Sequence, residues 1–214
     1  MSSNSPSRLT GIDVSHFQGQ VDWQAVKAAG CVFAFAKATE GAGEVDPQFA
    51  ANWAGMKAAG ILRGAYHFYR AEQSATAQAA HFLSTVQFET GDLPPVLDIE
   101  VNDGVVGQPL VGGVQAWLDA VEPVAGVTPV IYTNTPFWNA HFNDQFGQYP
   151  LWVAHYTSAP APSPLPVGWT IWTFWQYSQS LSIAGVGGPA DHDYFNGPLS
   201  QLQALAVQPT GSSQ

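Results

Sequence analysis

The chain has 214 residues, and its 16 Asp and Glu residues outnumber its 6 Lys and Arg residues, which gives a formal net charge of −10. This excess of negative charge opposes binding to nucleic-acid phosphates and to anionic lipid, so we exclude nucleic acid as the main partner. Charged residues make up only 10% of the chain and aromatic residues 13%, a composition that suits a neutral, ring-shaped ligand.

Strands and helices are predicted to alternate over the first two thirds of the chain. Short apolar runs predict strands at residues 9–14, 32–39, 62–69, 95–100 and 129–133. Helical spacing of apolar residues predicts helices at residues 21–30, 48–59, 75–85 and 114–121. Such alternation implies right-handed parallel βαβ units, and five units in succession favour a closed or nearly closed barrel.

The last third of the chain breaks this rhythm. A short helix is expected within residues 136–142 and a terminal helix at 198–205, whereas the Pro-rich stretch 159–166 cannot be helical. Strands are predicted at residues 151–155, 169–177 and 190–195. The predicted fold is therefore α/β, a modified TIM-like barrel of five βα units followed by three strands largely without intervening helices.

We expect a single catalytic barrel domain over residues 9–207, with flexible tails at 1–8 and 208–214. The first residues lack the apolar core of a signal peptide, and no apolar run approaches the ~20 residues of a membrane span. Cys31 is the only cysteine, so no intrachain disulfide can form, and its apolar neighbours predict a buried thiol.

Two carboxylates inside an apolar strand are the strongest chemical signal. Asp98 and Glu100 alternate with Leu97 and Ile99, and no basic residue lies beside them in the sequence. Because successive strand side chains point to opposite faces, both acids look into one space. Their repulsion raises one pKa, which produces the acid beside a carboxylate that glycosidases use. The alternative is a strand end whose carboxylates cap a helix or meet solvent.

Other polar and aromatic residues end neighbouring strands. In α/β barrels the reactive groups lie at the carboxyl ends of the strands, where the βα loops enclose a cleft. The residues predicted at this edge are Asp13, Lys37, Thr39, Tyr66, Phe68 and Tyr132. Each has a simpler explanation, since strand aromatics commonly fill a barrel and Lys37 could serve only to neutralise a buried acid.

Seven motifs follow one another along nearly the whole chain. They are GIDVSHFQG at 11–19, FAKATEG at 35–41, GAYHF at 64–68, VLDIE at 96–100, LWVAHY at 151–156, WQY at 175–177 and DHDYF at 191–195. In this order they resemble the glycoside hydrolase family 25 lysozymes of the Chalaropsis type. The resemblance implies an N-acetylmuramidase that hydrolyses the β-1,4 bond between N-acetylmuramic acid and N-acetylglucosamine in bacterial peptidoglycan, in a long groove at the strand ends.

The resemblance also implies roles for individual residues. Glu100 matches the general acid/base, Asp98 its partner carboxylate, and Asp13 an active-site carboxylate near the cleft floor. Asp191 matches the fourth acid, whereas Asp193 stands where the family commonly has Asn, and both would share a face of an extended segment. The residues expected to bind substrate are Lys37, Tyr66, Phe68, Tyr132, Trp152 and Gln176. We expect retention of configuration with help from the substrate's N-acetyl group.

Two alternative functions remain open at this stage. A catalytically silent glycan-binding module would use the same aromatic rings, because fold does not fix function. A hydrolase of chitin-like polymers would use the same pair of acids. The six histidines show no metal-ligand spacing, so we expect no metal and no cofactor. We expect a monomer that acts outside the cell or is delivered to the cell wall.

Overall fold

The computed structural model describes residues 8–208, so the expected tails at 1–8 and 208–214 lie almost wholly outside the described residues. Within this range the strands form one sheet in the order β1-β9-β8-β7-β6-β5-β4-β2-β3, and a further pairing of β1 with β2 closes eight of them into a barrel. The strands are β1 Leu9–Val14, β2 Phe33–Glu40, β3 Glu44–Val45, β4 Leu62–Phe68, β5 Val96–Asp98, β6 Val130–Asn134, β7 Leu151–Ala154, β8 Phe174–Leu181 and β9 Ala190–Phe195.

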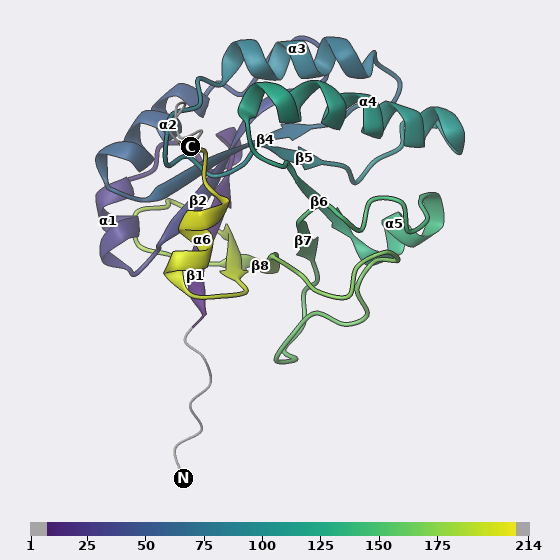
Figure 1. Ribbon diagram of the computed structural model, residues 1–214. Coiled ribbons are helices and arrows are strands. Elements are labelled where there is room, and N and C mark those ends of the chain that lie inside the picture. Colours follow the sequence, from purple (N-terminus) through teal and green to yellow (C-terminus); the bar gives the residue numbers. More distant parts are fainter. Residues whose placement is uncertain (1–7, 209–214) are drawn as a thin grey trace, which may run out of the picture.

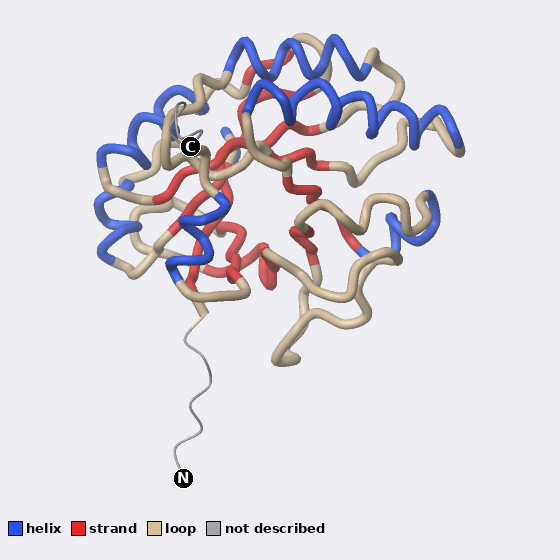
Figure 2. The backbone as a smooth tube through the Cα atoms, viewed as in Figure 1, coloured by secondary structure: helices blue, strands red, loops and turns tan. Residues whose placement is uncertain are grey.

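The helices before β7 lie on the outside of this ring of strands (Figure 2), and the last helix packs Leu202 against residues inside the barrel. The helices are α1 Trp23–Ala28, α2 Phe49–Ala58, α3 Ala75–Thr85, α4 Gln108–Ala125, α5 Thr135–His141 and α6 Leu199–Leu205, with a 3-10 turn η1 at His16–Gln18. One helix follows each of β1, β4, β5 and β6, and α2 follows the β2–β3 hairpin, whereas β7, β8 and β9 succeed one another without helices between them (Figure 1). The predicted barrel architecture is therefore confirmed.

The direction of the strands determines which residues reach the cleft end of the barrel. β1, β2 and β4 to β8 are parallel to one another around the ring, but β9 is antiparallel to both of its neighbours, β8 and β1. Consequently the first residues of β9, and not its last, lie at the end where the parallel strands finish.

Two predicted strands have different limits in the structure. The strand expected at 169–177 begins only at Phe174, because Trp169 and Trp172 lie in the preceding loop. The Trp169 indole donates to the Tyr149 carbonyl at 2.7 Å. Because this buried ring lies in a loop, the loop has the apolar sequence that is typical of a strand. The strand expected at 95–100 ends at Asp98, although the Ile99 N–H still donates to the Tyr132 carbonyl at 3.0 Å.

Helix α4 is longer than the predicted 114–121. Pro109 occupies its first turn, where a missing N–H costs no intrahelical bond, and Pro123 lies in its last turn. Gly113 lies where a Cβ atom would be 2.4 Å from the Tyr69 hydroxyl, so glycine permits close packing at this point. The prolines and this glycine made the predicted helix too short, but in the structure they do not end the helix.

The inside of the barrel divides into an apolar half and a polar half. Rings of Phe33, Phe35, Trp152 and Phe174 pack together, and Leu202 of α6 joins this inner cluster. The rings of Phe35 and Trp152 have centroids 4.6 Å apart. Burial of each such side chain contributes ~1.5–3 kcal/mol to the free energy of unfolding. This packed apolar cluster holds the strands in place around the polar end of the barrel.

Candidate active site

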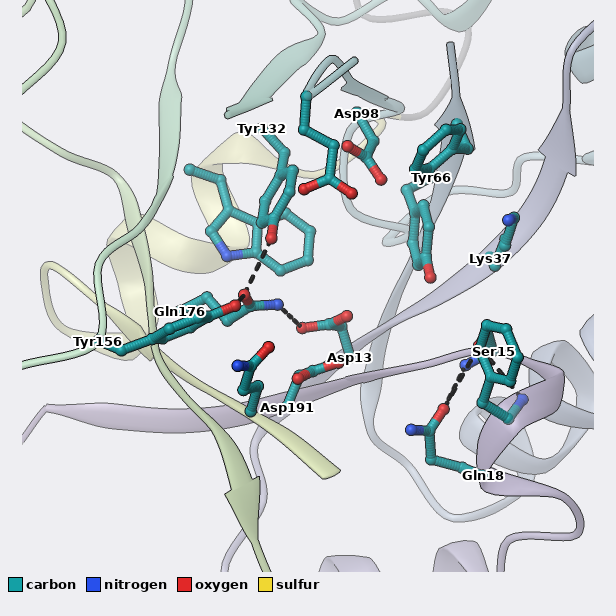
Figure 3. Close-up of a pocket in the computed structure, with 15 residues that line it drawn as sticks. Asp13, Ser15, Gln18, Lys37, Tyr66, Asp98, Tyr132, Tyr156, Gln176 and Asp191 are labelled. Atoms are coloured by element: carbon teal, nitrogen blue, oxygen red, sulfur yellow. Dashed lines mark hydrogen bonds between the residues drawn. The ribbon is translucent and has the colours of Figure 1, made fainter. Parts of the chain in front are cut away.

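Four carboxyl groups meet in one cleft at the polar end of the barrel (Figure 3). Asp13 is the penultimate residue of β1, Asp98 ends β5, and Glu100 follows two residues later. Asp191 is the second residue of the antiparallel β9 and lies opposite Asp13 in the β1–β9 pairing. The barrel thus brings together the four acids that the sequence singled out.

Burial shapes the protonation of the central pair. Loss of solvation raises the pKa of Asp98 well above its usual range, and repulsion from Glu100 raises it further, while Lys37 lowers it. Burial also raises the pKa of Glu100, against an opposing effect of Lys37. Two carboxyl groups in this environment favour holding a proton near neutral pH. This is the electrostatic condition for a general acid beside a carboxylate.

The fourth acid belongs to the same electrostatic group. Burial and the nearby Glu100 raise the pKa of Asp191 to about 6. Asp191 therefore changes its charge within the neutral range, and the charge of Glu100 is one of the causes.

Lys37 lies in the cleft and also neutralises an acid. Its Nζ is 2.5 Å from Glu40 Oε2 and 4.8 Å from the centre of the Phe68 ring. Lys37 thus lines the cleft and also pairs with Glu40, while its expected role in substrate binding stays a prediction. All six residues predicted to bind substrate line the cleft: Lys37, Tyr66, Phe68, Tyr132, Trp152 and Gln176.

Gln176 connects the cleft floor to its aromatic wall. Its Nε2 donates to Asp13 Oδ2 at 2.7 Å, and its Oε1 accepts from the hydroxyls of Tyr132 at 2.9 Å and Tyr156 at 2.7 Å (Figure 3). Because Asp13 accepts from the amide nitrogen, the amide oxygen must face the two tyrosines. Each phenol then keeps its lone pairs available for an incoming hydroxyl or amide.

Sequence reasoning missed several residues of the cleft. These are Ser15, Phe17, Gln18, Tyr156 and Gln179. Phe17 is 82% exposed on η1, a turn that the side chains of Ser15 and Gln18 cap reciprocally. An aromatic residue in a polar turn directly after a strand end was the available signal, because the loops that follow barrel strands line the active-site face.

Thr39 does not reach the cleft, so its predicted place there was wrong. A shift in the β2–β4 register between Lys37 and Thr39 reverses the alternation of side chains. Thr39 is fully buried outside the barrel, and its hydroxyl is 2.7 Å from His67 Nδ1.

Asp193 lies on the same inner face of β9 as Asp191 but deeper in the barrel. It is 0% exposed and accepts a hydrogen bond at 2.9 Å from the Trp152 indole. Asp191 lines the cleft and Asp193 does not.

A second hollow continues the cleft beyond Glu100. Glu100, Tyr132 and Tyr156 line both hollows, and the second also contains Asn134, Thr135, His155 and Pro164. Glu100 therefore lies between two spaces, as an acid acting on a bond between two sugar rings must.

Residues 8–208 contain no group of three or more His, Cys, Asp or Glu side chains arranged to hold a metal ion. In the same range no helix has the length and apolar character needed to cross a membrane.

Comparison with known proteins identifies the family to which the chain belongs. The sequence profile described as glycosyl hydrolases family 25 matches residues 12–186. The chain belongs to glycoside hydrolase family 25.

Relatives of this family 25 protein include characterised and uncharacterised members. It is 42% identical over 214 residues to Lysozyme M1 of Streptomyces globisporus, covering 94% of this chain and 72% of that protein. It is 41% identical over 202 residues to the uncharacterized protein YegX of Escherichia coli K12, covering 92% and 73%. The crystal structure of a bacterial lysozyme from Streptomyces coelicolor matches with a TM-score of 0.89 at 39% identity, covering 95% and 99%. The family 25 chain is thus a glycoside hydrolase with the fold of a lysozyme.

Proposed function

We propose that this family 25 hydrolase is a peptidoglycan lysozyme that cleaves the β-1,4 bond after N-acetylmuramic acid, at the bacterial cell wall. The observation that carries the proposal is the place of Glu100, beside Asp98 and between two hollows lined with aromatic and neutral polar groups. The family and its lysozyme relatives support the substrate class.

Glu100 supplies the proton for the leaving sugar. Burial raises the pKa of Glu100, and the protonated form of this residue can protonate the glycosidic oxygen. The resulting carboxylate then takes a proton from the attacking water. A single group thus serves as acid and as base, which is how retaining glycosidases use this residue.

Asp98 is placed to receive an N–H group of the substrate. Its Oδ1 is buried and has no hydrogen-bond partner among residues 8–208. A buried oxygen of this kind costs ~1–3 kcal/mol unless a donor reaches it. The N–H of an N-acetyl group would satisfy Oδ1, stabilise the charged form of Asp98, and leave the shared proton on Glu100. The acetamide oxygen could then attack the anomeric carbon, which gives overall retention.

A glycan without N-acetyl groups is expected to resist cleavage, because it has neither the N–H donor nor the acetamide nucleophile. The measurement compares initial rates on native and chemically de-N-acetylated peptidoglycan, with re-acetylated material as the control. Rapid hydrolysis of the de-N-acetylated glycan would exclude assistance and make Asp98 the direct nucleophile.

Removal of divalent ions is expected to leave the hydrolysis rate unchanged, because two carboxyl groups suffice for glycosidic cleavage. The rate is measured before and after dialysis against a chelator. Activity that vanished in the chelator and returned with one particular ion would overturn this prediction.

Asp191→Asn is expected to reduce activity far more than Asp193→Asn, because only Asp191 lines the cleft. Loss of this negative charge lowers the pKa of Glu100, so the alkaline limb of the pH profile moves to lower pH. The measurement is kcat/KM from pH 4 to 9 for both variants. Unchanged activity of Asp191→Asn together with a large loss of activity in Asp193→Asn would reverse the two roles.

Digestion of two polymers tests the substrate class. Purified peptidoglycan and chitin are incubated with equal amounts of enzyme, and new reducing ends are counted. We expect release from peptidoglycan. Release from chitin alone would change the substrate, and binding to both polymers without release would indicate a silent glycan-binding module.

A further inference from the structure

The Asp193 carboxyl group is sealed inside the barrel and is only half satisfied. It lies opposite Gly11 of β1 and Gln176 of β8 in the strand register. Trp152 donates to its Oδ1, but no N–H or O–H donor of the described residues reaches its Oδ2. A charged carboxylate in this position would leave one oxygen buried without a donor, which is costly.

The neighbouring strand carries a second buried carboxyl group. Asp13 lies two residues from Gly11, the partner of Asp193 in the β1–β9 pairing, so both side chains point into the barrel from adjacent strands. The charge of Asp193 also raises the pKa of Asp13. Asp13 is itself buried, and its Oδ2 already accepts from Gln176. A hydrogen bond between two carboxyl groups requires a proton on one of them, because two carboxylates offer only acceptors.

We propose that Asp13 and Asp193 share a single proton beneath the cleft, and that Asp193 is a positioning residue that acts through Asp13 and Gln176. One proton supplies the missing donor and leaves one negative charge on the pair. Trp152 and Gln176 each donate to one member, so both carboxyl groups keep a fixed orientation. Two carboxyl groups that occupy one buried site generally retain a proton between them, because like charges so close together cannot both ionise.

Within residues 8–208 no positively charged side chain contributes to the pKa of either carboxyl group. Burial is the largest cause that raises the pKa of either carboxyl, and Asp191 raises both further. The other titratable groups whose pKa one of the two charges raises are the thiol of Cys31, two residues before β2, and the phenols of Tyr66, Tyr132, Tyr156 and Tyr177. These groups are neutral at neutral pH.

The shared proton matters for the cleft because of the orientation it imposes. With one negative charge, Asp13 holds the Gln176 amide nitrogen, and the amide oxygen holds the hydroxyls of Tyr132 and Tyr156. The consequence for catalysis rests on the proposed function. The protonation state itself does not, so it is tested without an activity assay.

The test compares thermal unfolding of the wild-type protein and of Asp193→Asn between pH 4 and pH 9. Asn has nearly the same shape and donates an N–H to Asp13 at every pH. The folded wild-type pair holds a proton that the unfolded chain releases above about pH 4, the ordinary carboxyl pKa. Wild-type stability from this proton is complete below that pH and is lost as pH rises toward the raised pKa of the pair.

We therefore expect the wild-type Tm to fall relative to that of Asp193→Asn by about 3–5 °C per pH unit within this window. Asp119→Asn, at an exposed position on α4, is the control for loss of one negative charge and is expected to show no such slope. A difference between wild type and Asp193→Asn that stays constant with pH would overturn the proposal.

A measurement on the wild-type protein covers the case in which Asp193→Asn does not fold. The carboxyl carbons of Asp residues are titrated by carbon-13 NMR. We expect the assigned Asp13 and Asp193 carboxyl carbons to move together at a pH well above the ordinary range. Independent titration of these two carboxyl groups near pH 4 would contradict the shared proton, whether or not the protein cleaves peptidoglycan.

Discussion

Replacement of Glu100 by Gln is expected to abolish hydrolysis while glycan binding survives. The substitution removes the titrating proton but keeps nearly the same shape between the two hollows that Glu100 lines. The loss in kcat should be ~10²-fold or more, which is the usual weight of a general acid. The measurement pairs kcat on soluble glycan strands with the Kd of an uncleaved fragment determined by calorimetry.

Glu122→Gln is the matched control, because Glu122 lies on α4 and lines neither hollow. This variant should behave like the wild type. Wild-type turnover by Glu100→Gln would place the acid on another residue, and a parallel loss of binding would show that the variant had damaged the cleft as a whole.

Asp98→Asn is expected to produce the second large loss, again about 10²-fold or more in kcat on N-acetylated glycan. Asp98 Oδ1 is buried and has no hydrogen-bond partner in residues 8–208. The substitution removes the carboxylate charge with which this side chain would orient an N–H donor of the substrate. Removing this acid also removes repulsion between it and Glu100, so the alkaline limb of the pH profile should move to lower pH.

The pH profile of Asp98→Asn is measured beside that of Asp119→Asn, which removes the same charge from an exposed surface. Because substrate binding uses the whole cleft, KM should change much less than kcat. Full activity of Asp98→Asn would show that Glu100 needs no partner carboxylate and would refute the proposed mechanism.

Local patterns in the sequence were sufficient to predict the barrel. Each of the first five strands is a short apolar run followed by a segment of helical pattern, so the alternation and the connection rules determine the architecture. They could not give the limits of β8, because the buried rings of Trp169 and Trp172 make a loop as apolar as a strand. They also shortened α4, since Gly113 reads as a breaker until Tyr69 is known to pack against it.

The candidate site was predictable in its acids but not in its hydrogen bonds. Asp13, Asp98 and Glu100 follow from their place at strand ends, and Asp191 from family resemblance. The network around Gln176 joins residues up to 163 positions apart in sequence, and only the closed barrel brings them together. Thr39 was misplaced because a β-bulge leaves no clear signal in the sequence.

Mass spectrometry of the soluble fragments from digested peptidoglycan tests the central claim most directly. The sugar at each new reducing end identifies the bond that was cut, and a Glu100→Gln digest provides the blank. The proposed function predicts fragments that end in reducing N-acetylmuramic acid for the wild type and none for the variant. Fragments that end in reducing N-acetylglucosamine would contradict it.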